Sequence, residues 1–325
     1  MFEPFYNLSE QPFQLSPDPA FFYASRGHKR AYAYLQYGLY QGEGFITLTG
    51  EVGAGKTTLI RNLLKQLDSS KVVAAQLVST QLDADDLLRA VAAAFGVAVK
   101  EHDKANLIAQ IESFMLSLVA KGRRPLLIVD EAQNLAPQAV EELRMLSNFQ
   151  LKNRALLQSF LVGQPELRNL MRGPQMQQLR QRVIAAFHLN ALDGDETRAY
   201  IEHRLRHVGW KGDPAFEDGT FELIHAFTGG IPRQINTFCT RMLLAAFLSD
   251  KHRIGLEDIQ HVIGEFKEEF GPAAAKAPAL DNDDPVAGLE KRIAGVERAI
   301  GITVNLLRQV IRREQPQPEL KKKIR

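Results

Sequence analysis

Residues 50–57 have the residue types and the spacing that are needed to hold the phosphates of a nucleotide. They fit the pattern G-x-x-x-x-G-K-[ST], in which glycines allow a tight loop whose backbone N–H groups face the phosphates. We expect Lys56 to reach the β and γ phosphates and Thr57 to ligate Mg²⁺. A chance match in a surface loop is the alternative, but an apolar strand pattern at 45–49 and helical spacing at 58–67 flank the segment as nucleotide binding requires. The expected nucleotide contacts are Gly50, Glu51, Val52, Gly53, Ala54, Gly55, Lys56, Thr57 and Thr58.

Two carboxylates that follow the apolar run at 125–129 could form the metal and water side of the same site. A continuous apolar run is typical of a strand covered on both faces, and Asp130 and Glu131 come directly after it. We expect Asp130 to hold Mg²⁺ through its water shell and Glu131 to polarise the attacking water. The pair is weak evidence alone, but it lies about 75 residues after the phosphate loop, and each motif needs the other to complete a site.

A further polar residue, Gln164, lies at the end of the strand pattern at 156–162. In a sheet of this kind that strand lies beside the phosphate-loop strand, so Gln164 could reach the γ phosphate or the lytic water. The alternative is a turn residue before a helix that begins at Pro165.

Four arginines lie on the helical pattern at 165–182. Arginines on one helix usually form a solvated face, but one near its end could act as a finger that reaches the γ phosphate of a neighbouring subunit. These residues are Arg168, Arg172, Arg180 and Arg182.

After Asp193 the strand patterns stop and amphipathic helical patterns follow, which predicts a separate small helical domain. Its most informative segment is 228–233, where two glycines end one helix, a proline starts the next and Arg233 lies in the first turn. If this domain folds over the nucleotide, Arg233 can contact the phosphates; a plain helix junction is the alternative. The expected helices are 196–208, 216–228, 232–249 and 256–266.

The elements that must position these residues are strands and helices in alternation. Residues 1–44 contain four prolines among many aromatic residues, which predicts a packed arm, and helical spacing follows at 27–40 with Ser25 as a candidate N-cap. Aromatic residues of the arm could stack on an adenine or pack in the core; the candidates are Phe13, Phe22 and Tyr23. The other expected strands are 72–78 and 183–189, and the other expected helices are 83–95, 105–119 and 137–149.

The amino-acid composition is that of a soluble globular protein. The chain of 325 residues is 45% hydrophobic and 24% charged, which is ordinary for a soluble globular protein. Because no apolar run approaches the roughly 20 residues of a membrane span, we expect a cytoplasmic protein without a transmembrane segment. Residues 1–270 carry 29 Lys and Arg against 31 Asp and Glu, which makes nucleic acid an unlikely partner. The single cysteine, Cys239, lies in an apolar helical pattern that predicts a buried core position.

The C-terminal residues differ from the rest in composition. Residues 271–325 carry 11 Lys and Arg against 7 Asp and Glu. An a/d stripe of apolar residues within 286–314 predicts a helix that could form a coiled coil, dock on the protein's own surface or bind a partner. The basic end at 315–325 could touch acidic lipid or nucleic acid, although solubility alone would explain it.

These motifs together resemble those of the AAA+ ATPases, which implies an α/β P-loop fold: a five-stranded parallel sheet between helices, followed by an all-α lid. The resemblance extends to the general secretion pathway ATPase A group and, within it, to the branch associated with PEP-CTERM/exosortase and exopolysaccharide loci. The segments similar to the group are 12–19, His28, 37–39, 44–45, 130–135, 163–167 and 179–182, and those similar to the branch are 41–46 and 76–82.

The resemblance implies ATP with Mg²⁺, a homo-oligomer and a role in export or envelope polymer biogenesis. It assigns phosphate and metal binding to 50–57, the second acidic motif to Asp130 and Glu131, the first sensor to Gln164, the second sensor to Arg233 and the finger to Arg180 or Arg182. Secretion members of the group continue into a transmembrane helix and a periplasmic peptidoglycan-binding domain. Here a linker, a heptad helix and a basic tail follow residue 270, so we do not expect direct action on the cell wall.

We therefore expect a cytoplasmic ATPase that hydrolyses ATP at subunit interfaces and switches its own assembly or a partner in an envelope export or polysaccharide system, with the C-terminal helix as the partner-binding segment. A DNA-associated helper resembling transposition ATPases and a nucleotide-gated scaffold with little turnover are the alternatives. The expected domains are 1–190 for nucleotide binding with the arm, 191–270 for the lid, 271–285 for a linker, 286–314 for the heptad helix and 315–325 for the tail.

Overall fold

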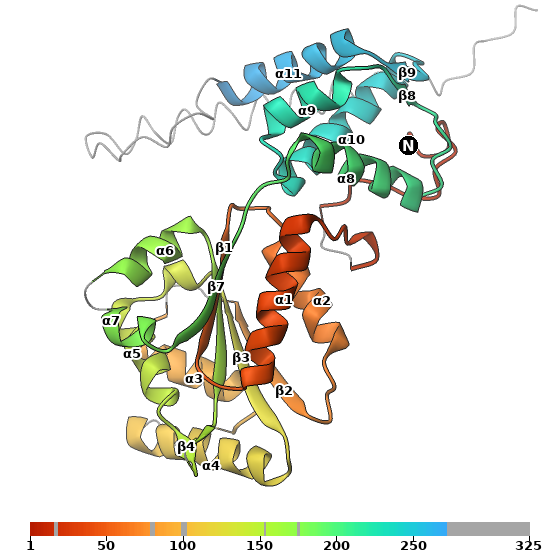
Figure 1. Ribbon diagram of the computed structural model, residues 1–325. Coiled ribbons are helices and arrows are strands. Elements are labelled where there is room, and N and C mark those ends of the chain that lie inside the picture. Colours follow the sequence, from red (N-terminus) through yellow and green to blue (C-terminus); the bar gives the residue numbers. More distant parts are fainter. Residues whose placement is uncertain (16–18, 79–81, 99–102, 153, 174–175, 272–325) are drawn as a thin grey trace, which may run out of the picture. The chain divides into compact units, whose positions relative to one another are not determined.

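The computed structural model describes residues 1–15, 19–78, 82–98, 103–152, 154–173 and 176–271 (Figure 1). The chain divides into two compact units, Met1–Gly255 and Leu256–Arg325. In the second unit, helix α11 (Leu256–Phe270) makes up nearly all of the described part. The predicted heptad helix and basic tail, and all but the first residue of the linker, lie outside the described residues.

A five-stranded parallel sheet forms the centre of the first unit, as predicted (Figure 1). The strand order is β2-β3-β6-β1-β7. The three inner strands are buried almost throughout, because helices cover both faces of the sheet, whereas the two edge strands keep exposed positions. The strands are β1 (Phe45–Gly50), β2 (Val72–Val78), β3 (Arg124–Asp130), β6 (Gln158–Gly163) and β7 (Val183–Leu189).

The strand order brings the ends of β1, β3 and β6 to one edge of the sheet. In the parallel register, Thr49 of β1 lies beside Gly163 of β6, and Val129 of β3 lies beside Leu161 of β6. The residues that directly follow these three strands therefore meet at the carboxyl edge, where ligands bind in open α/β sheets.

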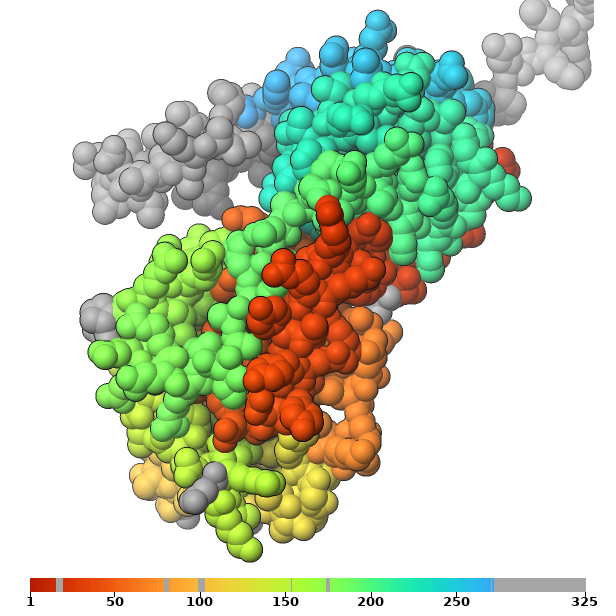
Figure 2. Space-filling model, in the orientation of Figure 1, coloured from red at the N-terminus to blue at the C-terminus, as the bar shows by residue number. Residues whose placement is uncertain are grey.

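Helices α1 (Arg26–Gln41) and α2 (Lys56–Gln66) cover one face of the sheet. Leu35 of α1 and Leu59 of α2 share a buried core with Ile128 of β3. Figure 2 shows the first helix, in orange-red, at the surface beside the green chain of β7. Because α2 begins directly after the loop that leaves β1, packing of α2 on the sheet fixes the position of that loop.

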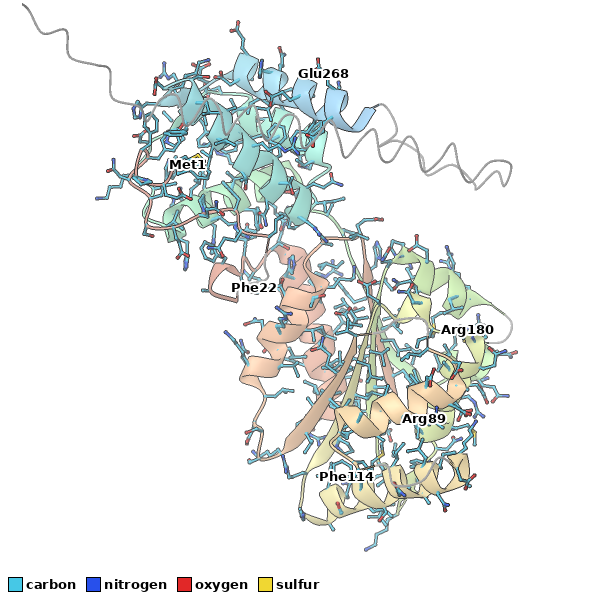
Figure 3. All side chains as sticks on the ribbon, turned by 180° about the vertical axis from the view of Figure 1, so that it is seen from behind. Met1, Phe22, Arg89, Phe114, Arg180 and Glu268 are labelled. Carbon is cyan, nitrogen blue, oxygen red and sulfur yellow. The ribbon has the colours of Figure 1, made fainter. Side chains whose placement is uncertain are left out.

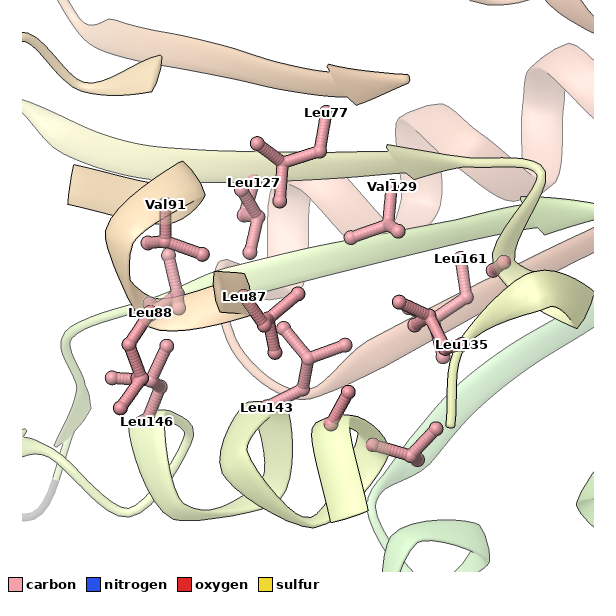
Figure 4. Close-up of a cluster of buried hydrophobic side chains, with 14 of the residues drawn as sticks. Leu77, Leu87, Leu88, Val91, Leu127, Val129, Leu135, Leu143, Leu146 and Leu161 are labelled. Atoms are coloured by element: carbon pink, nitrogen blue, oxygen red, sulfur yellow. The ribbon is translucent and has the colours of Figure 1, made fainter. Parts of the chain in front are cut away.

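Helices α3 (Ala84–Ala94), α4 (Lys104–Ala120) and α5 (Pro137–Leu146) cover the other face. Figure 4 shows how Leu87 of α3 and Leu143 of α5 point toward Leu127 and Val129 of β3. Alternate residues of β3 thus enter the two cores, which holds its carboxyl end rigidly between two layers of helices.

The segment predicted as one helix at 165–182 is two helices. Helix α6 (Pro165–Arg172) ends at Gly173, whose extended backbone (φ −58°, ψ 152°) suits the residue before a proline. A second short helix, α7 (Gln177–Arg180), follows, and Arg182 lies beyond its end. Proline at position 174 therefore interrupts the helical pattern.

After β7 the first unit continues as helices α8 (Gly194–His207), α9 (Thr220–Thr228) and α10 (Pro232–Leu248), as predicted. The prediction that strands stop here was wrong in one detail, because two-residue strands β8 (Ala215–Phe216) and β9 (Arg253–Ile254) pair in parallel. Two residues are too short to give a period-2 pattern in the sequence. A short hairpin, β4 (Gln150–Leu151) with β5 (Arg154–Ala155), was not predicted either.

The N-terminal arm packs mainly on the helices that follow β7. Arg204 of α8 is buried, and its Nε donates a hydrogen bond to the carbonyl of Pro12 at 2.6 Å. At the other end of the arm, the hydroxyl of Tyr6 donates to the carbonyl of Lys251 at 3.0 Å. Phe13, an adenine-stacking candidate, is buried at 3% exposure, which favours the core-packing alternative for that residue.

Candidate nucleotide-binding site

The loop between β1 and α2 has a backbone that only glycine fits at two positions. Gly53 and Gly55 have φ of 83° and 99°, in the left-handed region. A Cβ atom at Gly53 would lie 2.4 Å from the Cβ of Arg233, and one at Gly55 would lie 2.7 Å from the Nε2 of His28. The glycines therefore allow both the turn and the close approach of two other segments to this loop.

Lys56, the first residue of α2, lies inside the loop. Its side chain is 6% exposed, and its Nζ donates hydrogen bonds to the carbonyls of Gly50 at 2.7 Å and Glu51 at 3.0 Å. Burial lowers the pKa of Lys56, although the charges of Glu131 and Asp130 act in the opposite direction. The ammonium group is thus held at the loop by its carbonyls.

Thr57 and Asp130 join the loop to the acidic pair. The Thr57 hydroxyl donates a hydrogen bond to Oδ2 of Asp130 at 3.1 Å, so the two motifs converge in space as expected. Burial raises the pKa of Asp130, against hydrogen bonds from Thr57 and from the backbone N–H of Glu131. A hydroxyl and a carboxylate oxygen at hydrogen-bonding distance are the hard ligands that Mg²⁺ prefers, so these residues fit the ion.

Glu131 follows β3 in a left-handed backbone conformation (φ 53°, ψ 38°), which is unusual for a residue with a side chain. Its Oε2 accepts hydrogen bonds from Nε2 of Gln133 at 2.6 Å and from Nε2 of Gln164 at 3.1 Å. Burial raises the pKa of Glu131, but these two bonds and the charge of Lys56 outweigh it, so that the pKa lies below its ordinary value. The carboxylate is therefore ionised at neutral pH, as a base must be.

Gln164 lies at the tip of β6 and is the N-cap residue of α6. It is both a turn residue and a contact of the site, so the two alternatives for this residue are compatible. Its hydrogen bond to Glu131 brings the strand tip and the acidic pair together.

Helix α10 begins beside the phosphate loop. Gly229 and Gly230 have positive φ, Pro232 is the first helical residue, and the backbone N–H of Arg233 donates to the carbonyl of Gly53 at 3.2 Å. The Gly-Gly-x-Pro-Arg segment therefore carries Arg233 to the loop rather than serving only as a helix junction.

Arg180 and Arg182 bond to other parts of their own subunit. Nη1 of Arg182 donates to the hydroxyl of Ser147 at 2.7 Å, and Nη1 of Arg180 donates to the carbonyls of Met171 and Arg172. Figure 3 shows Arg180 on the other side of the sheet from the first helix. Within the described residues, neither arginine is hydrogen-bonded to Asp130 or Glu131 of the same chain.

The remaining predicted contacts differ in their exposure to solvent. Glu51 and Val52 are exposed, Ala54 is buried at the base of the loop, and Thr58 is half-buried in the first turn of α2. Glu51 and Val52 are accessible to a ligand, whereas the side chain of Ala54 is buried.

Two residues near the site had no predicted role of their own. His28 of α1 is buried, its Nδ1 lies 2.7 Å from the Ser25 hydroxyl, and it is hydrogen-bonded to the backbone of Ala54. Burial lowers the pKa of His28. Gln133 bonds to Glu131, as described above. Both residues lie in segments that carry the family resemblance, and this is the feature of the sequence that points to them. Their contacts depend on tertiary structure.

Comparison with known proteins agrees with this geometry. Residues 39–171 match the family described as AAA domain. The Aeropyrum pernix ORC2 protein, solved as ADPNP–ADP complexes, has a TM-score of 0.59 at 19% identity over 79% of this chain and 72% of that one. CDC6P from Pyrobaculum aerophilum has a TM-score of 0.57 at 17% identity over 77% of this chain and 71% of that one.

The chain contains an AAA domain in an AAA+ fold.

General secretion pathway protein A of Aeromonas hydrophila is 41% identical to this AAA+ protein over 260 residues, which are 80% of this chain and 47% of the relative. The predicted resemblance to the general secretion pathway ATPase A group is therefore confirmed, and the chain spans about half the length of that relative. Along the described part of the AAA+ protein, every helix is too short or too polar to cross a bilayer.

Proposed function

We propose that this protein hydrolyses ATP with Mg²⁺ and uses the cycle to drive the assembly or regulation of an envelope export system. The observation that carries the proposal is the hydrogen bond of 3.1 Å between Thr57 and Asp130, because it joins the phosphate loop to the acidic pair. A nucleotide whose phosphates lie at this loop has its terminal phosphate beside Glu131.

In the proposed reaction the oxygen of a water molecule forms a bond to the γ phosphorus of ATP. The bond between that phosphorus and the oxygen that bridges to the β phosphate breaks, and ADP leaves with that oxygen. Glu131 accepts a proton from the water and later returns it to solvent. Lys56 offsets negative charge on the β and γ phosphates, and the amide of Gln164 orients the terminal phosphate or the water.

Thr57 and Asp130 are the residues that would hold Mg²⁺, Asp130 through water. The ion supplies charge neutralisation at the β and γ phosphate oxygens. The direct hydrogen bond between the two side chains supports the assignment, because their two oxygen atoms lie 3.1 Å apart.

Catalysis at a subunit interface would explain why neither arginine candidate is hydrogen-bonded to the acidic pair of its own chain. Arg182 lies after α7 and bonds to Ser147, away from its own acidic pair. We infer that Arg182, or failing that Arg180, acts on the site of a neighbouring copy, which makes a homo-oligomer the active form.

The process proposed is export or exopolysaccharide biogenesis of the PEP-CTERM/exosortase kind, with the protein in the cytoplasm and its C-terminal helix bound to a partner. The support is the 41% identity to General secretion pathway protein A together with the segments at 41–46 and 76–82. The near-neutral charge of residues 1–270 argues against nucleic acid as the partner.

The test compares the wild-type protein with Glu131→Gln over a range of protein concentrations. Phosphate release should depend on Mg²⁺, rise more than in proportion to concentration as the oligomer forms, and fall by about 100-fold or more in Glu131→Gln, while ATP binding is retained. A wild-type protein that binds ATP but releases no phosphate at any concentration would reject hydrolysis in favour of a nucleotide-gated scaffold. Pull-down with Glu131→Gln held in ATP should recover an envelope export protein. Recovery of duplex DNA with a steep salt dependence would reject the export role.

A further inference from the structure

Gln133 connects the acidic pair to the neighbouring strand tip. It belongs to the short helix η2 (Ala132–Asn134) directly after Glu131. Its Nε2 donates to Oε2 of Glu131 at 2.6 Å, and its Oε1 accepts from the backbone N–H of Gln164 at 2.9 Å. The Gln164 side chain donates to the same Glu131 oxygen at 3.1 Å. Three side chains and one backbone group thus form a closed set of hydrogen bonds.

The orientation of the Gln133 amide is fixed by its partners. A backbone N–H can only donate, so the atom that faces Gln164 must be the amide oxygen. The amide nitrogen then points to Glu131, whose ionised carboxylate can only accept. A flipped amide would lose both bonds, so the two partners fix the direction in which the Gln133 amide points.

The contact between Gln133 and Gln164 depends on a glycine at the end of β6. Gly163, the last residue of β6, has no side chain, and a Cβ atom there would lie 2.6 Å from Oε1 of Gln133. On the other side, the left-handed backbone of Glu131 turns the chain directly after the strand, so that Gln133 faces back toward the carboxylate. Such backbone conformations persist only where the surroundings support them, and they concentrate at functional sites.

We propose that Gln133 is a positioning residue that holds Glu131 oriented for the attack of water on ATP and links that orientation to the tip of β6. The inference rests on the proposed hydrolysis. Within the described residues, both side-chain hydrogen bonds to Glu131 are accepted by Oε2, which leaves Oε1 for the water. Gln164 lies between β6 and α6, so a movement of this strand tip would move Gln164. That movement would act on Glu131 in two ways, through the hydrogen bonds of Gln133 and through the direct hydrogen bond from the Gln164 side chain.

The experiment uses two substitutions of Gln133 and a matched control. Gln133→Leu keeps the size but removes both hydrogen bonds. Gln133→Glu keeps an acceptor for the Gln164 N–H but places a second carboxylate against Glu131. The control, Gln138→Leu, makes the same Gln-to-Leu change at an exposed position on α5 and should leave the activity unchanged.

Gln133→Leu should lower kcat by about 10-fold or more, with the Kd for Mg-ATP within about 2-fold of wild type. The acidic limb of the kcat profile should move to higher pH in Gln133→Leu, and further in Gln133→Glu, because the two carboxylates there share a proton. Unchanged kcat and pH profile would overturn the proposal, and so would a faster rate, which would show that Gln133 restrains Glu131 instead. A loss of ATP affinity equal to the loss of rate would indicate a general structural effect.

A readout that does not need turnover separates this inference from the proposed function. The ¹³C NMR titration of the Glu131 carboxylate, assigned by its loss in Glu131→Gln, should move to higher pH in Gln133→Leu and stay in place in Gln138→Leu. If the wild-type protein releases no phosphate and yet this titration moves, the hydrolysis proposal fails while the contact stands. If phosphate release depends on Glu131 but neither kcat nor the titration responds to Gln133, the positioning role is rejected alone.

Discussion

The backbone N–H of Arg233 donates a hydrogen bond to the carbonyl of Gly53 at 3.2 Å, and the Cβ of Arg233 occupies the space that a side chain at Gly53 would need. The first turn of α10 therefore rests on the phosphate loop itself. A helix that follows the sheet by some 40 residues is in contact with the segment that we assign to phosphate binding, so a change in the loop reaches α10 without an intermediate element.

Gly53→Ala should weaken nucleotide binding and lower the free energy of unfolding by about 1–2 kcal/mol, because it adds a strained backbone at φ 83° and a contact with Arg233. Isothermal titration with Mg-ATP and denaturant unfolding would measure both effects. Gly96→Ala is the matched control, since Gly96 has φ of 75° with no neighbour within 4 Å of the added Cβ. Equal effects on ATP binding at the two positions would contradict the role of the Arg233 contact.

Lys56→Ala should reduce ATP affinity by about 100-fold or more, because the ammonium group is the one cation held inside the described loop and phosphate binding depends on it. Fluorescent nucleotide binding measures the change. Lys65→Ala removes an exposed lysine from the last turn of the same helix and should bind ATP as the wild type does. Retained affinity in Lys56→Ala would mean that the loop is not the phosphate site.

Arg182→Ala should lower turnover by about 100-fold or more without lowering ATP affinity, as expected for a finger that acts on a neighbouring site. Mixing Arg182→Ala subunits with Glu131→Gln subunits tests whether the arginine acts on the neighbouring site. Some interfaces in the mixture combine the intact Glu131 of an Arg182→Ala subunit with the intact Arg182 of a Glu131→Gln subunit, and these interfaces are complete. Phosphate release by the mixture should exceed that of either variant alone. Arg172→Ala changes an exposed arginine at the end of α6 and serves as the control. A mixture as inactive as its components would assign Arg182 to its bond with Ser147 instead.

His28 should make stability depend on pH in the acid range. Burial lowers its pKa in the folded protein below the ordinary value of 6.5, so the unfolded chain binds the proton more readily. Stability should therefore fall as the pH falls below about 6.5, by at most about 1.4 kcal/mol per pH unit from this one group.

Urea unfolding of the wild type and of His28→Gln at pH 5.5 to 8 would isolate that contribution. Burial also lowers the pKa of His188 and His203, and both remain in the variant. The two stability curves should run parallel above about pH 7 and converge toward lower pH. Curves that remain parallel over the whole range would show that His28 does not resist protonation.

The sheet and the central site could be predicted because their determinants are local. An apolar run predicts each inner strand, and the glycine pattern at 50–57 specifies its own loop geometry. The sheet brings together two such motifs at the ends of parallel strands, which is why the sequence alone predicts that Thr57 and Asp130 lie close together.

Contacts that join distant segments could not be predicted in this way. His28 lies in an ordinary amphipathic helix, and only packing of α1 on the sheet carries its ring to Gly55. Gln133 gains its partner from a strand that begins 25 residues later, and nothing in its own neighbourhood indicates which amide atom faces which group. The break between α6 and α7 is different, because Gly173 and the proline after it are local signals that outweigh the helical spacing of the arginines.

The attachment of the arm to α8 and to the segment between α10 and β9 has a consequence for biosynthesis. Tyr6 reaches its acceptor, Lys251, across 245 positions, and Pro12 reaches Arg204 across 192. A ribosome that adds about 5–20 residues per second needs about ten seconds or more after making the arm before Arg204 and Lys251 exist. Through that interval Phe2, Tyr6 and Phe13 lack the native surface that covers them in the folded protein, so the first residues to be translated complete their native contacts late.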